Sequence, residues 1–354
     1  MTTPPNDRGF YGRNESRRNK GQRDQPIKIY EGETYYGRPV LKEPSWGWLI
    51  TIYFFIGGIA GASQIIATIA DLFGGHRDRS VVRAGRYTAL VGAMLSPIFL
   101  IADLHTPQRW FNMLRIFRKT SAMSIGSWTL AIFGALSGLV AAGQALDDLF
   151  GLRAGRWLAR LFGIPAALAG MMMSVYTGVL LSATSVPLWA AAYKRLPALF
   201  GVSAMATGSS MLSLILAISG APKSVLRRIE RLALIANLTE SVLSVAVEQE
   251  WKRQELETPV KQPPLDSAHR FGEQGLGIAV PILLRTINML FGRGSRTLTM
   301  GAAISTLIGG FTQRTVMVFA GRKSALRPED YFRFTQPGAP TAGEGRISMA
   351  GEQR

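Results

Sequence analysis

The chain contains no cysteine among its 354 residues. It therefore cannot form a disulfide, a thiolate zinc site or an iron–sulfur cluster with thiolate ligands of its own. Histidine is also scarce, because only His76, His105 and His269 occur, and all three lie in or beside polar gaps. A haem held between paired histidines inside a helix bundle is thus not expected. The sequence predicts that this chain carries no metal, no haem and no cluster.

Charged residues make up only 18% of the chain, which is low for a soluble domain. They are concentrated near the two ends and in short gaps between apolar segments of about 20 residues or more, a length that crosses a bilayer as a helix. The sequence therefore predicts a polar basic tail over 1–45, a polytopic helical membrane domain over 46–321 and a polar tail over 322–354. Both tails have the composition of disordered ends or of arms that grip a peripheral subunit.

The expected fold is an all-α integral membrane protein, because only helices and closed barrels satisfy the backbone within lipid and alternating barrel strands are absent. We predict eight transmembrane helices. Their ranges are 46–72, 85–104, 122–147, 161–189, 196–219, 226–247, 275–291 and 297–320. Glycines at helical spacing predict close helix contacts at Gly57, Gly58 and Gly61 in the first span and at Gly134 and Gly138 in the third.

The net charge of +17 raises the question of a nucleic-acid partner. Membrane proteins commonly carry excess Lys and Arg in their loops, where these residues fix topology and meet anionic lipid. The chain has no zinc-finger spacing and no basic stripe interleaved with aromatic residues. We therefore expect the lipid bilayer, and no nucleic acid, as the partner of this charge.

Asp103, His105 and Arg109 follow directly where a long apolar segment ends. A carboxylate at the end of a membrane span is costly unless it is paired or hydrated, so such groups are candidates for function. Asp103 and Arg109 can pair across the turn at Pro107 and simply cap the span. His105, which titrates near neutral pH when unperturbed, can alternatively relay protons.

Further polar residues lie within the predicted spans, namely Tyr53, Tyr176, Glu240, Arg285 and Arg314. Several of them, with Asp103, fall within about 10 Å of one membrane face at 1.5 Å per residue. One interpretation is structural, with Glu240 neutralising Arg314 or Arg285. The other is a site for a membrane-soluble quinone with access to protons, since hydroxyl, imidazole, carboxylate and guanidinium groups at this depth suit its carbonyl oxygens and its protons.

Five ordered segments resemble the NrfD/PsrC family, the membrane subunits of polysulfide reductase, formate-dependent nitrite reductase and related molybdopterin enzymes. The segments are YGRPVLK from Tyr36, WGW from Trp46 with YFFIGGIAG from Tyr53, DLHTPQRWFNML from Asp103, SAMSIGSW from Ser121, and YTGVLL from Tyr176 with LPALF from Leu196. The chain departs from the family pattern at His105 and Thr106, which replace Gly-Arg, and at Ala122, which replaces Pro.

The resemblance implies two four-helix bundles, no haem, and a site for menaquinone or ubiquinone beside the iron–sulfur cluster of a ferredoxin-like partner subunit, with a larger catalytic subunit beyond it. It implies a location in the prokaryotic plasma membrane. By position it points to Tyr53, Asp103 and Tyr176 at the quinone. We add His105 and Arg109 to this set.

The polar residues Glu240, Arg285 and Arg314 predict a proton path. Trp46, Asn112 and Trp128, which lie in the resembling segments, are predicted contacts with the partner. Two other interpretations stay open at this stage: a transporter or channel, which would use broken helices and a site at the midplane, and a purely structural anchor that never handles quinone.

Overall fold

The computed structural model describes residues 39–291 and 294–335, and every regular element in this part of the chain is a helix. Most of the predicted tail over 1–45 and of the predicted tail over 322–354 falls outside these residues. The long helices are α1 (Trp48–Phe73), α2 (Arg79–Ala102), α4 (Ala122–Phe150), α5 (Arg153–Ser182), α7 (Leu196–Ile218), α8 (Lys223–Arg253), α11 (Val280–Leu290) and α12 (Arg296–Ala325). The short elements are η1 (His76–Asp78), η2 (Pro107–Arg109), α3 (Asn112–Arg115), α6 (Pro187–Ala191), α9 (Thr258–Lys261), α10 (Leu265–Ser267), the π-helix η3 (Ala268–Ala279) and α13 (Pro328–Thr335).

Five helices in the described part are long and apolar enough to cross a membrane: α1, the segment from His76 to the end of α2, α4, α5 and α7. They correspond to the first five predicted spans. The other three predicted spans also form helices, in α8, in η3 with α11, and in α12, but these sequences are more polar. Each carries buried ionisable side chains, for example Glu240, Arg285 and Arg314. The count of eight spans therefore stays a prediction.

Two predicted boundaries differ from the structure. The fourth span was expected over 161–189, but α5 starts at Arg153 and ends at Ser182. It stops there because the Thr184 hydroxyl donates to the Leu181 carbonyl, at 2.8 Å, and closes a turn before Pro187 starts α6. A second difference concerns the eighth span, which was expected over 297–320, because the helix α12 starts at Arg296 and continues to Ala325, and α13 follows it.

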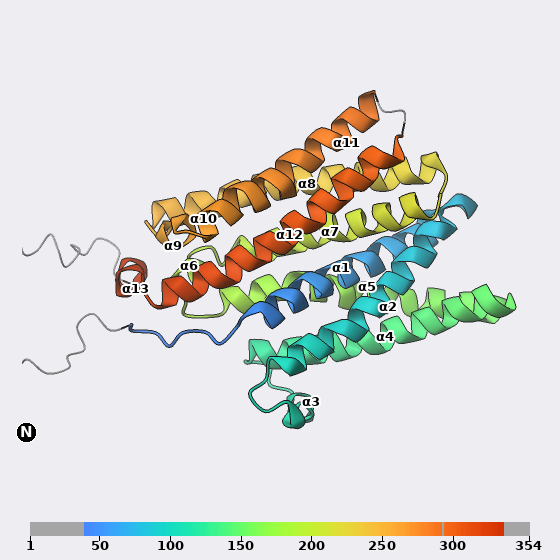
Figure 1. The fold of residues 1–354 in the computed structure, drawn as a ribbon. Helices are drawn as coiled ribbons and strands as arrows, with labels where there is room; N and C mark the ends of the chain where they lie inside the picture. Colours follow the sequence, from blue (N-terminus) through green and yellow to red (C-terminus); the bar gives the residue numbers. More distant parts are fainter. Residues whose placement is uncertain (1–38, 292–293, 336–354) are drawn as a thin grey trace, which may run out of the picture. The chain divides into compact units, whose positions relative to one another are not determined.

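The long helices form two groups. The first group consists of α1, α2, α4 and α5, and the second of α7, α8, η3 with α11, and α12. Successive long helices run in opposite directions (Figure 1). We call the end where α1 starts and α12 stops the near end, and the end where α1 stops and α2 starts the far end. The groups meet mainly through α1, which contacts both α7 and α12, and through α5 and α7.

Glycine sets the closest approaches within and between these helices. A Cβ atom on Gly61 of α1 would collide with the carbonyl of Gly170 on α5, and one on Gly309 of α12 would collide with the backbone of Gly277 in η3. The predicted close contact at Gly61 is therefore confirmed. The same prediction is wrong for Gly134 and Gly138, because nothing lies within 4 Å of a Cβ at either position.

Candidate functional site

Tyr53 of α1 and Tyr176 of α5 are brought together in one buried apolar cluster with Leu130 and Met173. Their side chains are 2% and 6% exposed. The Tyr176 hydroxyl donates to the carbonyl oxygen of Ala122, at 2.7 Å, and so ties α5 to the start of α4. Both phenol groups lie near the near end, where the sequence placed Tyr53, whereas it placed Tyr176 nearer the midplane.

A groove of about 290 Å³ lies next to this cluster, between α2, the loop that carries α3, and α4. Leu130 and Ala93, which line the groove, also belong to the cluster that holds Tyr53 and Tyr176. The loop adds Trp110 to the wall, and the rest of the lining is mostly apolar. None of the five residues predicted for the quinone site lines this groove directly. The two tyrosines lie behind its wall instead.

Asp103 lies directly after the last residue of α2 and is half-buried. It follows Leu100 and Ile101, which line the groove, by less than one helical turn. Burial raises the pKa of the Asp103 carboxyl group, and the nearby His105 partly offsets this effect. His105 is exposed, so this carboxyl group lies at the edge of the groove near water.

The predicted ion pair between Asp103 and Arg109 is wrong, because no such contact occurs among the described residues. Arg109 ends the short helix η2 and is exposed. The loop folds back on itself there, since the Arg109 amide donates to the Thr106 carbonyl at 3.0 Å. Arg109 therefore lies on the surface of the loop and not against the tyrosine cluster.

The three predicted partner contacts lie in different surroundings. Trp46 is partly buried and stacks on Trp189, with ring centroids 5.4 Å apart. Trp128 is partly buried beside Phe117, and its indole nitrogen has no hydrogen-bond partner within the described residues. Only Asn112, at the start of α3, is exposed. The larger exposed surface of this loop was not predicted; it consists of Trp110, Phe111, Ile116 and Phe117.

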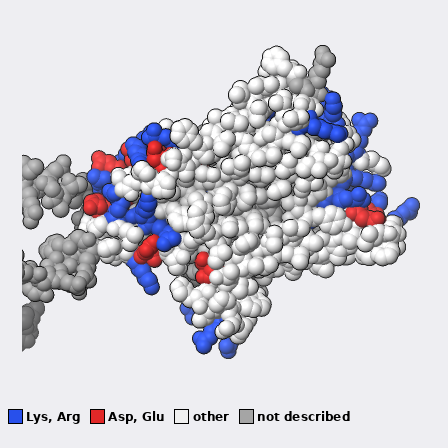
Figure 2. All heavy atoms as spheres, viewed as in Figure 1, with Lys and Arg blue, Asp and Glu red and all other residues white. Residues whose placement is uncertain are grey.

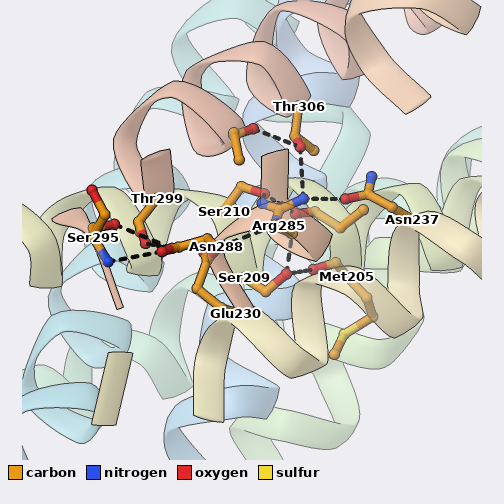
Figure 3. Close-up of polar contacts among 12 residues, drawn as sticks. Met205, Ser209, Ser210, Glu230, Asn237, Arg285, Asn288, Ser295, Thr299 and Thr306 are labelled. Carbon is orange, nitrogen blue, oxygen red and sulfur yellow. Dashed lines mark hydrogen bonds and ion pairs between the residues drawn. The ribbon is translucent and has the colours of Figure 1, made fainter. Parts of the chain in front are cut away.

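The side chain of Arg285 on α11 lies at the centre of a buried polar cluster (Figure 3). Its guanidinium group donates to the Ser210 hydroxyl at 2.7 Å, to the Thr306 hydroxyl at 3.1 Å and to the Asn237 side-chain oxygen. Its Nε atom lies 3.4 Å from a carboxylate oxygen of Glu230. The direct charge partner of Arg285 is therefore Glu230 on α8, and Glu240, one of the two alternatives considered from the sequence, acts on it from farther away.

Glu240 and Arg314 lie closer to the near end and are both buried. The Ser203 hydroxyl accepts a hydrogen bond from Arg314 at 3.0 Å and also approaches the Glu240 carboxylate. Arg314 stacks over Phe55 and Phe200 as well, at about 5.8 and 5.7 Å from the ring centroids. Asn237 donates to Glu240 at 3.4 Å and so links this pair to the cluster at Arg285. Glu240 and Arg314 are therefore electrostatic neighbours that both approach Ser203, and no direct ion pair joins them in the described part of the chain.

His269 in η3 lies toward the near end and contacts two carboxylates. Its Nδ1 atom lies 2.8 Å from a Glu273 oxygen, and its Nε2 atom lies 3.3 Å from a Glu248 oxygen. Burial lowers the pKa of the His269 imidazole, but the two carboxylates more than offset this and raise it to about 10. The pKa of Glu248 is lowered: burial acts to raise it, and the hydrogen bonds from His269 and Gln274 together with the nearby positive charges outweigh that effect. Both groups lie outside the predicted spans.

Sequence reasoning missed several buried polar residues for a common reason. Glu230 has three arginines close to it in the sequence, Arg227, Arg228 and Arg231, a pattern typical of a hydrated helix end. In the structure it is only 3% exposed. Arg86 likewise lies where a span was expected to begin, but it is buried between Gln144 and Asp71, at 2.8 and 3.0 Å. A helical wheel of α8 carries the missing signal, because Glu230, Asn237 and Glu240 fall on one face.

Within the described residues no group of three or more His, Asp or Glu side chains has an arrangement that could hold a metal ion. Comparison with protein families gives one clear result: the model described as polysulphide reductase, NrfD, matches residues 39–324. No curated protein matches the chain. The family match covers the described helices from before the start of α1 almost to the end of α12.

Proposed function

Because the chain belongs to the NrfD family, whose members are membrane subunits of quinone-linked oxidoreductases, we propose that it is the quinone-binding anchor of such a complex. In this proposal it exchanges electrons between the iron–sulfur cluster of a ferredoxin-like subunit and the quinone pool of a prokaryotic plasma membrane. A larger catalytic subunit, of the molybdopterin type, converts the other substrate. In this proposal the chain has no catalytic activity alone and acts as a subunit of the complex.

The groove between α2 and α4 is the observation that carries this proposal. It opens between helices that are apolar enough to face lipid, it has an apolar lining, and it ends near Asp103. An apolar pocket with a few convergent polar groups is the usual form of a site for a small hydrophobic molecule. The Trp128 indole adds a buried donor with no partner in the described part of the chain, next to Ser127 in the groove lining.

A bound menaquinone or ubiquinone would supply two-electron, two-proton chemistry at this groove. The side chains of the protein would hold its head and handle the protons. Tyr53 and Tyr176 keep the back wall of the groove in place. Asp103, whose pKa is raised by burial, can hold a proton closer to neutral pH than an ordinary carboxyl group, with His105 between it and water.

The loop between α2 and α4 is the proposed docking surface for the iron–sulfur subunit. It exposes Trp110, Phe111, Ile116 and Phe117, and Arg109 and Asn112 lie among them. Aromatic residues and Arg are the residue types enriched at protein interfaces. Docking there would place a partner cluster over the groove and beside Asp103.

The quinone proposal is tested with Ala131→Phe, which fills the groove from α4, and with Asp103→Asn, both in the assembled complex. The matched control is Ile132→Phe, one position along the same helix, where the side chain is 50% exposed and does not line the groove. We expect Ala131→Phe to raise the KM for quinone about tenfold, because a lost pocket contact costs about 1–3 kcal/mol. Asp103→Asn is expected to lower kcat for quinone.

Turnover of the catalytic subunit with a soluble dye should stay unchanged in both variants. If quinone turnover were normal in both while the complex assembled, the chain would be a structural anchor and the proposal would be wrong.

We further propose that the second group of helices conducts protons across a bundle of eight spans. A series of ionisable and polar side chains supports this: Glu248, His269 and Glu273 are in contact at one end, and Glu240, Asn237, Arg285 and Glu230 are in contact farther along, with an electrostatic interaction between Glu273 and Glu240. Glu230 and Glu248 are 18 residues apart on α8, about 27 Å at 1.5 Å per residue. That distance is close to the hydrocarbon thickness of a bilayer, about 30 Å.

The proton path is tested in proteoliposomes that contain the whole complex. We expect quinone turnover to generate a membrane potential, and Glu240→Gln to abolish the potential while turnover continues. The exposed Glu329→Gln serves as a control with the same chemical change. A potential that persists at full size in Glu240→Gln would contradict the path.

A further inference from the structure

A second and larger groove, of about 760 Å³, lies on the opposite half of the molecule and takes no part in the proposed electron or proton transfer. Its walls are α2 and α7, and its floor is α1. It therefore lies at a seam between the first and second groups of helices. Its wall residue Val91 is 54% exposed, so the groove is open to the surroundings of the helices.

The lining of this groove changes in polarity along its length. Its polar side chains, Ser80, Arg83, Tyr87, Thr88 and Ser219, lie in the half toward the far end, and apolar side chains follow toward the middle. From Ser80 to Leu95 on α2 the groove extends about 22 Å, and from Ser219 to Met211 about 12 Å. One leaflet of a bilayer, with its headgroup layer, is about 20–22 Å thick. The length of the groove along α2 therefore matches one leaflet, with its polar end at the headgroup level.

The rim at the far end is positively charged. Asp148 accepts from Arg83 at 2.5 Å and neutralises it. Arg79, next to Ser80, and Lys223, near Ala221, are exposed and form no ion pair among the described residues. Arg296 donates to the carbonyl oxygen of Ala221 at 3.1 Å and brings a further positive charge to this rim. Lys and Arg side chains gather over this end of the helices (Figure 2).

We propose that this groove is a binding site for an anionic phospholipid. The acyl chains lie along α2 and α7 between Val91, Leu95 and Met211, and the phosphate lies at the rim near Arg79 and Lys223. The uncompensated positive charge favours an anionic headgroup over a neutral quinone head, which has no charge for it to meet. The occupant fills the seam between α2 and α7, so it joins the two groups of helices on this side.

The proposal is tested by native mass spectrometry of the purified full-length protein after titration with dioleoylphosphatidylglycerol or dioleoylphosphatidylcholine. We expect preferential retention of phosphatidylglycerol by the wild type. We expect the double variant Arg79→Gln/Lys223→Gln to weaken this retention about tenfold, because it removes two positive charges that attract the anionic headgroup. Val91→Trp, which fills the groove without a change of charge, is expected to abolish it.

The control is Arg153→Gln/Arg231→Gln, which removes the same charge from exposed far-end positions that do not line the groove, and it should retain phosphatidylglycerol like the wild type. Equal retention of the two lipids by the wild type would overturn the proposal. So would unchanged phosphatidylglycerol retention in Val91→Trp, or loss of bound quinone from that variant in place of the lipid.

Discussion

Gly126 on α4 has no side chain where the ring of Tyr176 packs. A Cβ atom at this position would collide with the Tyr176 hydroxyl group. We expect Gly126→Ala to push the ring away, to break its hydrogen bond to Ala122 and to destabilise the protein by about 1–3 kcal/mol, the usual cost of overpacking. The measurement is the thermal unfolding temperature in detergent, together with the KM for quinone of the assembled complex.

Gly138→Ala is the matched control on the same helix, because nothing lies within 4 Å of a Cβ there. Its effect should stay within about 0.5 kcal/mol. Equal destabilisation by the two substitutions would show that loss of glycine itself, and not the contact with Tyr176, is responsible.

The pair formed by Arg285 and Glu230 makes a prediction for stability. Both side chains are nearly inaccessible, at 0% and 3% exposure. Arg285→Met leaves the Glu230 carboxylate buried without its charge partner, which typically costs about 3–5 kcal/mol. The double variant Arg285→Met/Glu230→Met removes both charges and should recover most of this loss. Unfolding in denaturant measures the difference, and a double variant less stable than Arg285→Met would contradict the pairing.

The identity of several site residues was predictable, but their contacts were not. Tyr53 and Tyr176 stand out as polar groups in apolar segments, and their meeting in one cluster agrees with that pattern. The partner of Arg285 was not predictable, because Glu230 and Glu240 both lie on the inward face of α8. Only the depth at which α11 crosses α8 selects between them, and that depends on packing across the whole second group.

Among the elements, the π-helix η3 presents His269 between carboxylates from two helices. The folded pKa of His269 is about 10, above its value of about 6.5 in an unfolded chain. Protonated His269 therefore stabilises the fold fully below about pH 6.5, and this contribution is lost as the pH rises through about 10. The unfolding temperature of the wild type should fall across this window.

His269→Gln is the comparison for this pH dependence, because glutamine keeps hydrogen-bonding capacity and does not titrate. The difference in unfolding temperature between wild type and variant should shrink from about pH 6.5 to about pH 10. A difference that is constant over this range would exclude titration of His269 as the cause.

Helix positions followed closely from the lengths of the apolar segments, as the start of α4 at Ala122 illustrates. The π-helix did not, because its backbone geometry leaves no clear mark in the hydrophobic pattern. Such geometry is rare and occurs mostly at functional positions, where packing supports it. Here the crossing of Gly277 and Gly309 and the contacts of His269 supply that support.

For the whole molecule, the absence of cysteine permits a direct test of topology. Single cysteines are introduced at Gly75 and Thr106, at opposite ends of α2, and at Lys223 and Lys252, at opposite ends of α8. If both helices cross the membrane, a membrane-impermeant maleimide added to right-side-out or inverted vesicles should label the cysteines that replace Gly75 and Lys223 from one side of the membrane. It should label the cysteines that replace Thr106 and Lys252 from the other side.

This labelling also tests the count of eight spans, since α8 is one of the three helices whose sequences are more polar. Labelling of the Lys223 and Lys252 positions from a single side would mean that α8 does not cross. The charges at both ends of the helices, with a broad band of uncharged residues between them in Figure 2, favour crossing.

The π-helix η3 also limits where insertions and deletions can occur in this protein during evolution. Each turn of a π-helix contains about one residue more than the 3.6 residues of an α-helical turn. Deletion of a single residue between His269 and Gly277 would let the segment relax to an ordinary helix. It would also change the angle between these two residues around the helix axis. Homologues that differ in length should therefore gain or lose residues in the preceding loop, before Leu265, and keep the spacing from His269 to Gly277 unchanged.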